Sequence, residues 1–536
     1  MVRSMREKGS MNDVENFMEM GNFMDKCLSF TRAMYNQAHA MGNCMAGFSR
    51  YLNDFMTPSL AAMNYFGKAE MKKIPQSHPV EGIHSYAGLA KFNNELGSRA
   101  ILSSMKFLGD YANMELKKAL DALYNTVFDK EGNGGGSGED IVAFTERHAM
   151  MADMLARGYP EAIKNIESEY GFGFERGENV KVAETDRFIL YQVLPIDPST
   201  EVRRDGKPIL IVPPYVLGAN ILGFLPRENR SYAHCFANLG IPTYIRIMKD
   251  IAATPAVQLA TGEEDAKDTR LFCERIMAEH GKPVTLNGYC QGGYVSICSL
   301  LSGELDGVVD ALITCVSPMD GTRSRGFKDF FGMLPDRFND LMYGTKTLPN
   351  GNQVGDGALM GWVYKLKSID AEFPVVAFLR DLMMFHPRKG KPPKVSKTAA
   401  AINYWLQNER CDLPLAVTRM SFDSYNIPVT EDGTLPVKLF GKALNFKRLQ
   451  EKKIPWLICY GEKDDLVEKE TALAPLDFVK AEVAPFPKGH VAIATSWSNP
   501  TSECALHARF GDNNYRGPVR FQLDLDPPVS HNPSES

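Results

Sequence analysis

The pattern of apolar and polar residues first predicts a helical region at the N-terminus. From residue 11 to about 125, apolar side chains recur mostly at three- and four-residue steps, which is typical of amphipathic helices. The stripe begins with Val14, Phe17, Met18, Met24, Cys27, Leu28, Met34, Tyr35, Met41, Met45, Phe48, Tyr51, Leu52 and Phe55. We interpret it as a helix hairpin that packs on its own domain. The alternative is a surface for partner helices or for an apolar inclusion, which flexible methionines would suit.

From Phe188 onward the pattern changes to short apolar runs that alternate with helical segments. The predicted strands are "RFILYQVL", "PILIVPP", "IPTYIRI", "PVTLNG" and "VDALITCVS", and "GEEDAKDTRLFCERIMAEH" is a predicted helix. This alternation favours an α/β fold with a mostly parallel sheet covered by helices. Residues 321 to about 400 break the rhythm with apolar helical segments, and we expect them to form a helical cap insertion.

These patterns predict the domain organisation. A helical region at 1–131 precedes a flexible Gly/Ser linker at 132–138, within "EGNGGGSGED". A catalytic domain at 139–510 contains the cap at 321–400, and a frayed tail follows at 511–536. Because the linker separates it from the sheet, we expect the helical region to be dispensable for the chemistry and to assist association.

Composition narrows the classes of protein that fit. The 536 residues are 44% hydrophobic and 23% charged, as in ordinary globular proteins, and the net charge of -5 gives no reason to expect a nucleic-acid partner. No apolar run approaches the roughly 18 residues of a membrane span. The N-terminus lacks the apolar core of a signal peptide, so we expect a cytoplasmic protein. Its ten cysteines show no paired spacing and no zinc-like cluster, which indicates free thiols.

One cysteine stands in a motif that is typical of nucleophiles. In "TLNGYCQGGYVS", Cys290 lies between Gly288 and Gly292, after a predicted buried strand and before an apolar helix. This is the spacing of a nucleophile elbow, with cysteine in the place usually held by serine. A buried structural cysteine beside an ordinary Gly-rich turn is the alternative, so the interpretation depends on catalytic partners.

A base and an acid follow in the chain order of α/β-hydrolases. His490 lies in "PKGHVAIA", where we expect a loop at the carboxyl edge of the sheet. Asp464 follows the apolar strand "WLICYG" at Gly-x-x-Asp spacing, and Asp465 is the alternative one residue on. For the oxyanion hole we expect the backbone N–H groups of Gln291, which follows the nucleophile, and of Val216, in the loop after "LIVPP".

From about Phe174 to Pro500, the sequence resembles the polyhydroxyalkanoate synthases. The segments that carry the resemblance are "FERGENVKV", "ILIVPPYVLGANILGFLPRENRSY", "GYCQGG", "NYWLQNERCDLP", "VKLFGKALNFKRLQEKKIPWLICYGEKDDLV" and "GHVAIA". The resemblance implies an α/β-hydrolase-like fold and a 3-hydroxyacyl coenzyme A thioester as substrate, with no cofactor or metal. Cys290 would carry the polyester as a thioester, His490 would deprotonate the thiol, and Asp464 would support His490 or activate the incoming hydroxyl. We expect the polyester granule surface and a second copy of the chain as partners.

The sequence departs from the family at two places, and two other functions stay open. Tyr215 stands where the family commonly has Trp, and "IRIMKD" replaces a Ser-Trp-Arg-like strand end, which affects the expected pocket shape and monomer preference. The first alternative function is an intracellular polyester depolymerase or acyl-CoA thioesterase with the same triad. The second is a non-catalytic granule-associated protein.

Overall fold

The computed structural model describes residues 2–73, 79–128, 138–174, 177–333, 341–387 and 392–523. Contacts divide the chain into two compact units. The first unit comprises Met1–Leu60, Asn93–Asn165 and Ser368–Ala400, and the second comprises Ala61–Phe92, Ile166–Lys367 and Ala401–Ser536. The predicted linker at 132–138 lies outside the described residues, except for Gly138. The division differs from a boundary at that linker, because 61–92 groups with the sheet and 368–400 groups with the long helices.

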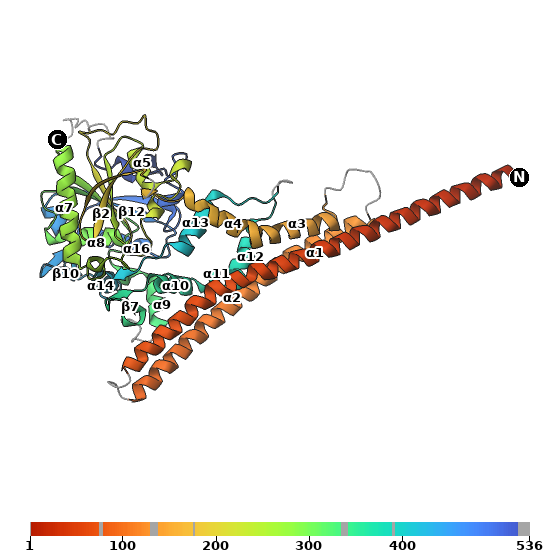
Figure 1. Ribbon diagram of the computed structural model, residues 1–536, viewed down its shortest axis with the longest axis horizontal. Helices are drawn as coiled ribbons and strands as arrows, with labels where there is room; N and C mark the ends of the chain where they lie inside the picture. The colour runs from red at the N-terminus through yellow and green to blue at the C-terminus, as the bar shows by residue number, and fades with distance from the viewer. Residues whose placement is uncertain are drawn as a thin grey trace. The chain divides into compact units, whose positions relative to one another are not determined.

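The first unit is built on two long antiparallel helices. α1 (Val2–Lys73) and α2 (Pro79–Phe128) run side by side (Figure 1), and the ammonium of Lys26 donates a hydrogen bond of 2.8 Å to the carbonyl oxygen of Val127. This confirms the helical N-terminal region. Among the described residues, no helix combines the length and apolar character that a bilayer-spanning segment requires.

Two shorter helices pack against this pair within the first unit. The ring of Phe378, on α12 (Pro374–Met384), meets Phe48 of α1 edge-on, with ring centroids 5.5 Å apart. On α3 (Ile141–Asp153), His148 and Arg147 hydrogen-bond to Glu115 of α2 at 2.8 and 3.4 Å. One face of the long helices is therefore occupied inside the unit by apolar and ionic contacts.

The second unit is organised by an eight-stranded sheet in the order β1-β2-β4-β3-β5-β6-β12-β13. The strands are β1 (Val180–Glu184), β2 (Phe188–Val193), β3 (Ile209–Val212), β4 (Thr243–Met248), β5 (Val284–Tyr289), β6 (Val309–Cys315), β12 (Trp456–Gly461) and β13 (Glu482–Phe486). β2 pairs antiparallel with β1 and β4, and the other neighbours are parallel. β3, β5 and β6 are apolar and almost fully buried because helices cover both faces. This order is that of the α/β-hydrolase fold, as expected.

Helices around the sheet begin and end at clear sequence signals. α7 (Gly262–His280) starts with a capping box between Thr261 and Glu264 and ends at Gly281, whose φ of 67° lies in the left-handed region. α8 (Gln291–Ser302) is buried along its whole length. α8 therefore anchors the residues at its N-terminus to the centre of the unit.

The break in the strand–helix rhythm corresponds to helices, as expected. The helices that follow β6 are α9 (Arg325–Met333), α10 (Gly357–Lys367), α11 (Ile369–Glu372), α12, α13 (Lys397–Asn408) and α14 (Leu415–Asn426). α9, α10 and α14 belong to the second unit, whereas α11 and α12 belong to the first. The predicted cap at 321–400 therefore differs from the observed one, because its later part groups with the first unit and α14 lies beyond its predicted end. From here on, the name cap denotes α9, α10 and α14.

Shorter elements complete the described chain. They are α4 (Tyr159–Asn165), α5 (Tyr232–Ala237), α6 (Pro255–Gln258), β7 (Thr345–Thr347), β8 (Gln353–Gly355), β9 (Leu413–Pro414), β10 (Thr434–Leu439), β11 (Lys442–Asn445), α15 (Lys447–Glu451), α16 (Lys469–Ala472), α17 (Ala492–Thr495), β14 (Arg509–Phe510) and β15 (Tyr515–Arg516).

The beginning of the predicted frayed tail is packed into the second unit. Val519, Phe521 and Leu523 are fully buried, and the hydroxyl of Thr285 on β5 donates a hydrogen bond of 3.2 Å to the carbonyl of Gln522. The prediction of a frayed tail is therefore wrong for this part of residues 511–523. The apolar side chains are buried against the second unit, which the polar residues around them in the sequence do not indicate. Residues 524–536 lie outside the described part of the chain.

Candidate active site

Cys290 occupies the sharp turn between β5 and α8. Its φ of 52° and ψ of −123° lie in a region that L-residues rarely adopt. Added side chains would not fit around the turn. A Cβ on Gly288 would collide with the first turn of α8, and one on Gly292 would collide with the carbonyl oxygens of Val212 and Pro213. The predicted strand–turn–helix is therefore present, and its glycines are required by close backbone approach.

An acid and a histidine meet at the ends of β12 and β13. The buried carboxylate of Asp464 accepts a hydrogen bond of 2.8 Å from His490 Nδ1. Its other oxygen accepts hydrogen bonds of 2.9 Å from the backbone N–H groups of Leu466 and Val467, which fix the carboxylate. The neighbouring Asp465 is exposed. The structure thus brings His490 together with the residue that the Gly-x-x-Asp spacing selects.

His490 is buried with one ring nitrogen toward Asp464 and the other available to the thiol. Its backbone carbonyl accepts a hydrogen bond of 2.9 Å from the hydroxyl of Tyr289, the residue before Cys290. Nε2 has no fully formed hydrogen bond within the described part of the chain. Burial alone would lower the pKa of His490. The charges of Asp464 and Cys290 outweigh burial and hold this pKa well above its ordinary value.

This electrostatic arrangement favours a protonated His490. Its raised pKa means that the imidazole can hold a proton next to the sulfur of Cys290. Cys290 is partly exposed, so its sulfur remains accessible to a substrate. The site can therefore present an activated sulfur nucleophile with a proton donor next to it.

The loop that carries the acid is tied to the cap. The carboxylate of Glu468 accepts hydrogen bonds from the N–H of Gly326, at 2.8 Å, and from the hydroxyl of Ser324, at 3.2 Å. Burial opposes ionisation of Glu468, but the hydrogen bonds outweigh it and lower its pKa. The ammonium of Lys367 on α10 also donates to the carbonyl of Asp465. The acid loop and the first two cap helices are thus joined directly.

Three aromatic side chains of the cap gather near the thiol. Phe327 of α9 packs on Tyr425 of α14 and Tyr364 of α10, with ring centroids 5.2 and 6.2 Å apart. Burial is the main cause of the raised pKa of both tyrosines, and the charge of Cys290 is the next. Sequence reasoning missed these residues, because no local motif links three side chains so far apart in the chain. We call them the aromatic roof.

The two expected oxyanion donors lie on elements that meet at the elbow. Gln291 is the first residue of α8, and Val216 follows the Pro213 loop, which is pressed against the elbow. Within the described residues, neither backbone N–H donates a hydrogen bond. The Gln291 side chain donates to Ser421 of α14 at 2.8 Å, and the Val216 carbonyl accepts from Cys411 at 3.2 Å. Both N–H groups are therefore free for a ligand oxygen, and their roles stay predictions.

Both departures from the synthase pattern lie in one buried cluster. The guanidinium of Arg246, within "IRIMKD", donates to the hydroxyl of Tyr215 at 2.9 Å and pairs with Asp265 at 2.8 Å. Tyr215 also hydrogen-bonds to Asp265. The two departures are thus coupled. Tyr215 and Arg246 line a cleft of ≈ 560 Å³, together with residues at the end of β4 and Arg410.

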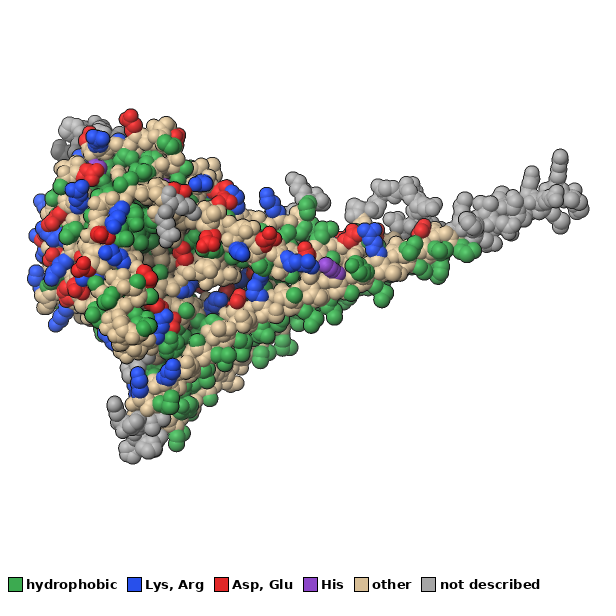
Figure 2. All heavy atoms as spheres, in the orientation of Figure 1, with side chains coloured by type: hydrophobic (Ala, Val, Ile, Leu, Met, Phe, Trp, Pro, Cys, Tyr) green, Lys and Arg blue, Asp and Glu red, His purple; other side chains and the backbone are tan. Residues whose placement is uncertain are grey.

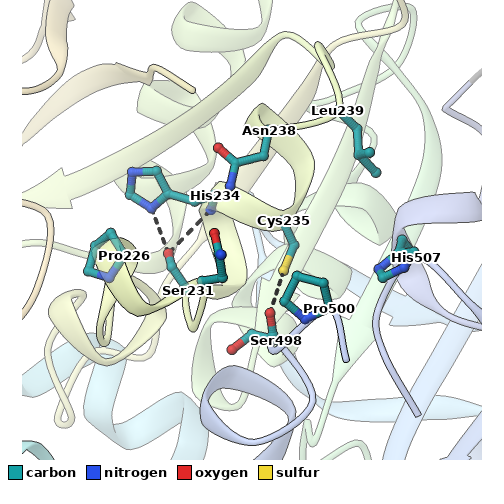
Figure 3. A pocket seen from close by; sticks show the side chains of 10 residues that line it. Pro226, Ser231, His234, Cys235, Asn238, Leu239, Ser498, Pro500 and His507 are labelled. Atoms are coloured by element: carbon teal, nitrogen blue, oxygen red, sulfur yellow. Dashed lines mark hydrogen bonds between the residues drawn. The ribbon is translucent and has the colours of Figure 1, made fainter. Parts of the chain in front are cut away.

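A second, smaller cavity contains a Ser–His pair that is structural. Ser231, His234 and Cys235 line a cavity of ≈ 150 Å³. Figure 3 shows these side chains at the cavity. The hydroxyl of Ser231 caps the N-terminus of α5 and lies 2.6 Å from His234 Nδ1. Burial lowers the pKa of His234 to about 4, so its ring is neutral at pH 7. The thiol of Cys235 donates to the carbonyl of Ser498 at 3.0 Å, so these groups are used by the fold.

Sheet order and side-chain geometry together define an α/β-hydrolase fold with Cys290, His490 and Asp464 at the positions where that fold carries a triad. The nucleophile position follows β5, the acid follows β12 and the histidine follows β13, which is the chain order of that fold. Cysteine replaces the usual serine at the elbow. This assignment depends on the topology and the side-chain geometry of the chain itself.

Comparisons with known proteins add only remote likenesses. No family model and no curated protein matches the chain. An esterase from Rhodococcus sp. ECU1013 is 13% identical, with a TM-score of 0.31 over 58% of this chain and 92% of that chain. A carboxylesterase from the thaumarchaeon Nitrososphaera gargenis is 12% identical, with a TM-score of 0.33 over 59% of this chain and 92% of that chain. A meta-cleavage product hydrolase from Pseudomonas fluorescens is 11% identical, with a TM-score of 0.29 over 57% of this chain and 88% of that chain. Sequence identities and TM-scores as low as these carry no argument about activity or substrate.

Proposed function

We propose that this protein is an acyltransferase that polymerises 3-hydroxyacyl-CoA into polyhydroxyalkanoate and releases coenzyme A. The observation that carries the proposal is the arrangement of Cys290 at the elbow beside His490, which is held by Asp464. A thiolate is a good nucleophile toward thioesters, and thioester exchange is nearly isoenergetic, so the acyl group can be passed on. The resemblance to polyhydroxyalkanoate synthases supplies the substrate class.

The first step transfers an acyl group to the protein. The thiolate of Cys290 attacks the thioester carbonyl, and the oxyanion is met by the backbone N–H groups of Gln291 and Val216. The bond between the carbonyl carbon and the coenzyme A sulfur breaks as the new bond to Cys290 persists. His490 gives its proton to the departing thiolate, and Asp464 keeps the ring oriented.

The second step forms the ester bond of the polymer. His490, now neutral, removes the proton from the hydroxyl of a second 3-hydroxyacyl group. The resulting oxygen nucleophile attacks the acyl thioester on Cys290, and the Cys290 thiolate leaves and regains the protonated histidine as its partner. Because the chain returns to the protein as a thioester in each cycle, we place the enzyme at the surface of polymer granules in the cytoplasm.

Water competes with the hydroxyl in the second step, and the aromatic roof favours the polymer. Phe327 packs on Tyr364 and Tyr425, and both tyrosines lie near enough to Cys290 for its charge to raise their pKa. Excluding water in this way protects an acyl intermediate from hydrolysis. This supports a transferase over a depolymerase or thioesterase built on the same triad.

Incubation of the purified full-length protein with 3-hydroxybutyryl-CoA tests the proposal. We expect coenzyme A release to rise together with turbidity, and Cys290→Ala, the matched control, to show neither. Release of coenzyme A with free 3-hydroxybutyrate and no turbidity would instead establish a thioesterase. No release with the wild-type chain would favour the non-catalytic granule protein.

A further inference from the structure

Tyr215, the residue before the expected oxyanion donor Val216, is buried in the second unit, with 6% of its surface exposed. Its hydroxyl accepts a hydrogen bond of 2.9 Å from Arg246 Nη2 and donates one to the carboxylate of Asp265. Arg246 lies on β4, and Asp265 lies in the first turn of α7. Tyr215 therefore ties the loop after β3 to two elements of the core.

The ion pair that receives this hydroxyl is buried and held in one geometry. Figure 2 shows basic and acidic side chains interspersed on the surface of the second unit, where ion pairs contribute little to stability. Arg246 and Asp265 are instead 2% and 1% exposed, and the two groups meet through hydrogen bonds of 2.9 and 2.8 Å. Arg246 Nη1 also donates to the hydroxyl of Thr269 at 2.6 Å. Bidentate pairing of this kind fixes direction as well as distance.

Stability alone does not account for such a pair. The desolvation penalty of two buried charges can exceed their attraction, and apolar side chains of similar volume are often at least as stabilising. Apolar side chains would not, however, fix the direction of a group that hydrogen-bonds to them. The Arg246–Asp265 pair does so for the hydroxyl of Tyr215.

The N–H of Val216 belongs to the peptide unit that joins it to Tyr215. A peptide unit is planar and turns as one body, so the direction of this N–H depends on the α-carbons at its two ends. The Val216 end is held, because the carbonyl of Val216 accepts a hydrogen bond of 3.2 Å from the N–H of Cys411. The carbonyl of Tyr215 accepts only a long hydrogen bond of 3.5 Å, from the N–H of Gly218 within the described residues. The side chain of Tyr215 is therefore the stronger anchor at the other end.

The loop lies where a small displacement affects the reaction. A Cβ on Gly292, in the first turn of α8, would lie 2.4 Å from the carbonyl oxygen of Pro213. The loop and the elbow are thus in close contact, and a shift of the loop changes the distance from its N–H groups to a carbonyl bound at the thiol. Displacing a positioned group by about 1 Å can cost about 10²-fold in rate.

We propose that Tyr215 is a positioning residue of the oxyanion hole, which, through Arg246 and Asp265, holds the N–H of Val216 toward the oxygen on which charge develops. The proposal rests on the proposed function, in which Cys290 is acylated. Tyr215 acts through the backbone and does not touch the substrate in this role. The proposal also links both departures from the synthase pattern, because Tyr215 and Arg246 are hydrogen-bond partners.

The test compares two variants of the full chain that each remove one hydroxyl from Arg246. Tyr215→Phe deletes the hydroxyl on the loop and keeps the ring. Thr269→Val, the matched control, deletes a second hydroxyl that accepts a hydrogen bond from the same guanidinium, but on α7. Each variant leaves an N–H of Arg246 without its acceptor, so we expect similar losses of stability in urea. A difference between their reaction rates therefore reports positioning and not stability.

Three reactions of Cys290 separate the oxyanion hole from the rest of the site. Acylation by 3-hydroxybutyryl-CoA and acylation by p-nitrophenyl acetate both place negative charge on a carbonyl oxygen. In the second reaction the sulfur bonds to the acetyl carbon, p-nitrophenolate leaves, and the thiol proton passes to solvent. Alkylation by iodoacetamide displaces iodide from a saturated carbon and develops no such charge. Mass spectrometry of the peptide that contains Cys290, sampled over time, gives all three rates.

We expect Tyr215→Phe to slow both acylations by about tenfold or more, because the oxyanion donor is displaced, and to leave alkylation at the wild-type rate. In steady-state release of coenzyme A, kcat should fall while KM stays within about twofold, as for an interaction made in the transition state. Thr269→Val should match wild type in every rate.

Equal acylation rates in Tyr215→Phe and wild type would overturn the proposal. Equal slowing of acylation and alkylation, which indicates damage to the whole elbow, would also overturn it, and so would equal slowing of acylation in Thr269→Val. If Tyr215→Phe does not fold, Arg246→Lys, which keeps the charge but loses the planar fork, carries the same expectations.

The two esters distinguish failure of this proposal from failure of the proposed function. A wild type that p-nitrophenyl acetate acylates at Cys290, but that releases no coenzyme A from 3-hydroxybutyryl-CoA, contradicts the proposed function alone, and the acetate rates then decide the role of Tyr215. A wild type that neither ester acylates at Cys290 overturns both.

Discussion

The proton between His490 and Cys290 distinguishes this site from a resting Ser–His pair. A serine hydroxyl keeps its proton until a substrate arrives, whereas the field of Asp464 and Cys290 keeps the proton on the imidazole here. This makes the carboxylate that holds the imidazolium the most sensitive residue after the thiol itself.

At the residue scale, Asp464→Asn is expected to lower turnover by about 10⁴, because an amide neither stabilises the imidazolium nor fixes its tautomer. Asp465→Asn is the matched control, since that exposed side chain lies one residue away. Initial rates of coenzyme A release from 3-hydroxybutyryl-CoA measure both. A larger loss for Asp465→Asn than for Asp464→Asn would show that the acid is Asp465.

The raised pKa of His490 also predicts how stability depends on pH. Protonated His490 is favoured in the folded chain, so its contribution to the free energy of unfolding is complete below the unfolded pKa of about 6.5 and is lost as the pH rises through the higher folded value. We expect His490→Gln to destabilise the protein more at about pH 6 than at about pH 9. Urea unfolding across this range measures the difference. A difference that is constant with pH would contradict the ion pair.

At the element scale, the cap and the catalytic loops act as one assembly. α9, α10 and α14 bring the aromatic roof to the thiol, and Gln291 at the elbow is bonded to α14 through Ser421. None of these helices carries a member of the proposed triad. In the proposed reaction, they would influence which acceptor reaches the acyl thioester.

Phe327→Ala is therefore expected to change the products more than the first step. Removing the ring opens the roof, and we expect the ratio of free 3-hydroxybutyrate to polymer to rise severalfold while acylation of Cys290 continues. Chromatography of the products measures the ratio. Phe327→Leu, which retains an apolar side chain of similar size, serves as the control and should remain close to wild type. An unchanged ratio in the alanine variant would show that the roof does not exclude water.

The segment after β14 offers a second test at this scale. Phe521 is fully buried, although the surrounding sequence is polar. We expect Phe521→Ala to lower the free energy of unfolding by about 3–5 kcal/mol, the usual cost of removing a buried ring. Chemical denaturation measures the change. A loss below about 1 kcal/mol would be typical of an exposed position and would mean that this segment is frayed.

At the scale of the whole molecule, the end of α1 and the start of α2, within residues 61–92, group with the second unit, which contains the eight-stranded sheet. Within the second unit, the hydroxyl of Tyr343 donates a hydrogen bond of 2.6 Å to the buried Glu70 of α1. Phe92 of α2 packs on Phe330 of α9, with ring centroids 5.9 Å apart. These contacts argue against the expectation that the N-terminal region is dispensable for the chemistry, which truncation would test.

A chain that starts at Glu139 is accordingly expected to lose acylation of Cys290. Truncation removes the partners of Tyr343 and Phe330 and leaves buried groups of the second unit exposed. Mass spectrometry after mixing with substrate measures the acyl-enzyme, and the full-length chain is the control. Unchanged acylation in the truncated chain would restore the boundary at the linker.

The sequence was sufficient to predict features that depend on residues close together in the chain. The elbow could be predicted because a strained turn demands glycines at fixed distances from Cys290, and Asp464 and His490 could be predicted because each follows an apolar strand. The packing of residues 61–92 could not, since a helical period reveals an apolar side but not its partner. The aromatic roof and the Tyr215–Arg246–Asp265 cluster depend on contacts between distant segments, which leave no pattern in the residues themselves.

The hydrogen bonds between Glu468 and the start of α9 limit how this protein can be re-engineered or can evolve. A cap is an attractive module for exchange, because its helices shape the room available to the substrate. Here, a transplanted cap would break the hydrogen bonds that Glu468 accepts from Ser324 and Gly326, four residues from Asp464. Substrate range and acid placement are therefore inherited together, and a workable chimera has to exchange residues 464–468 along with the cap.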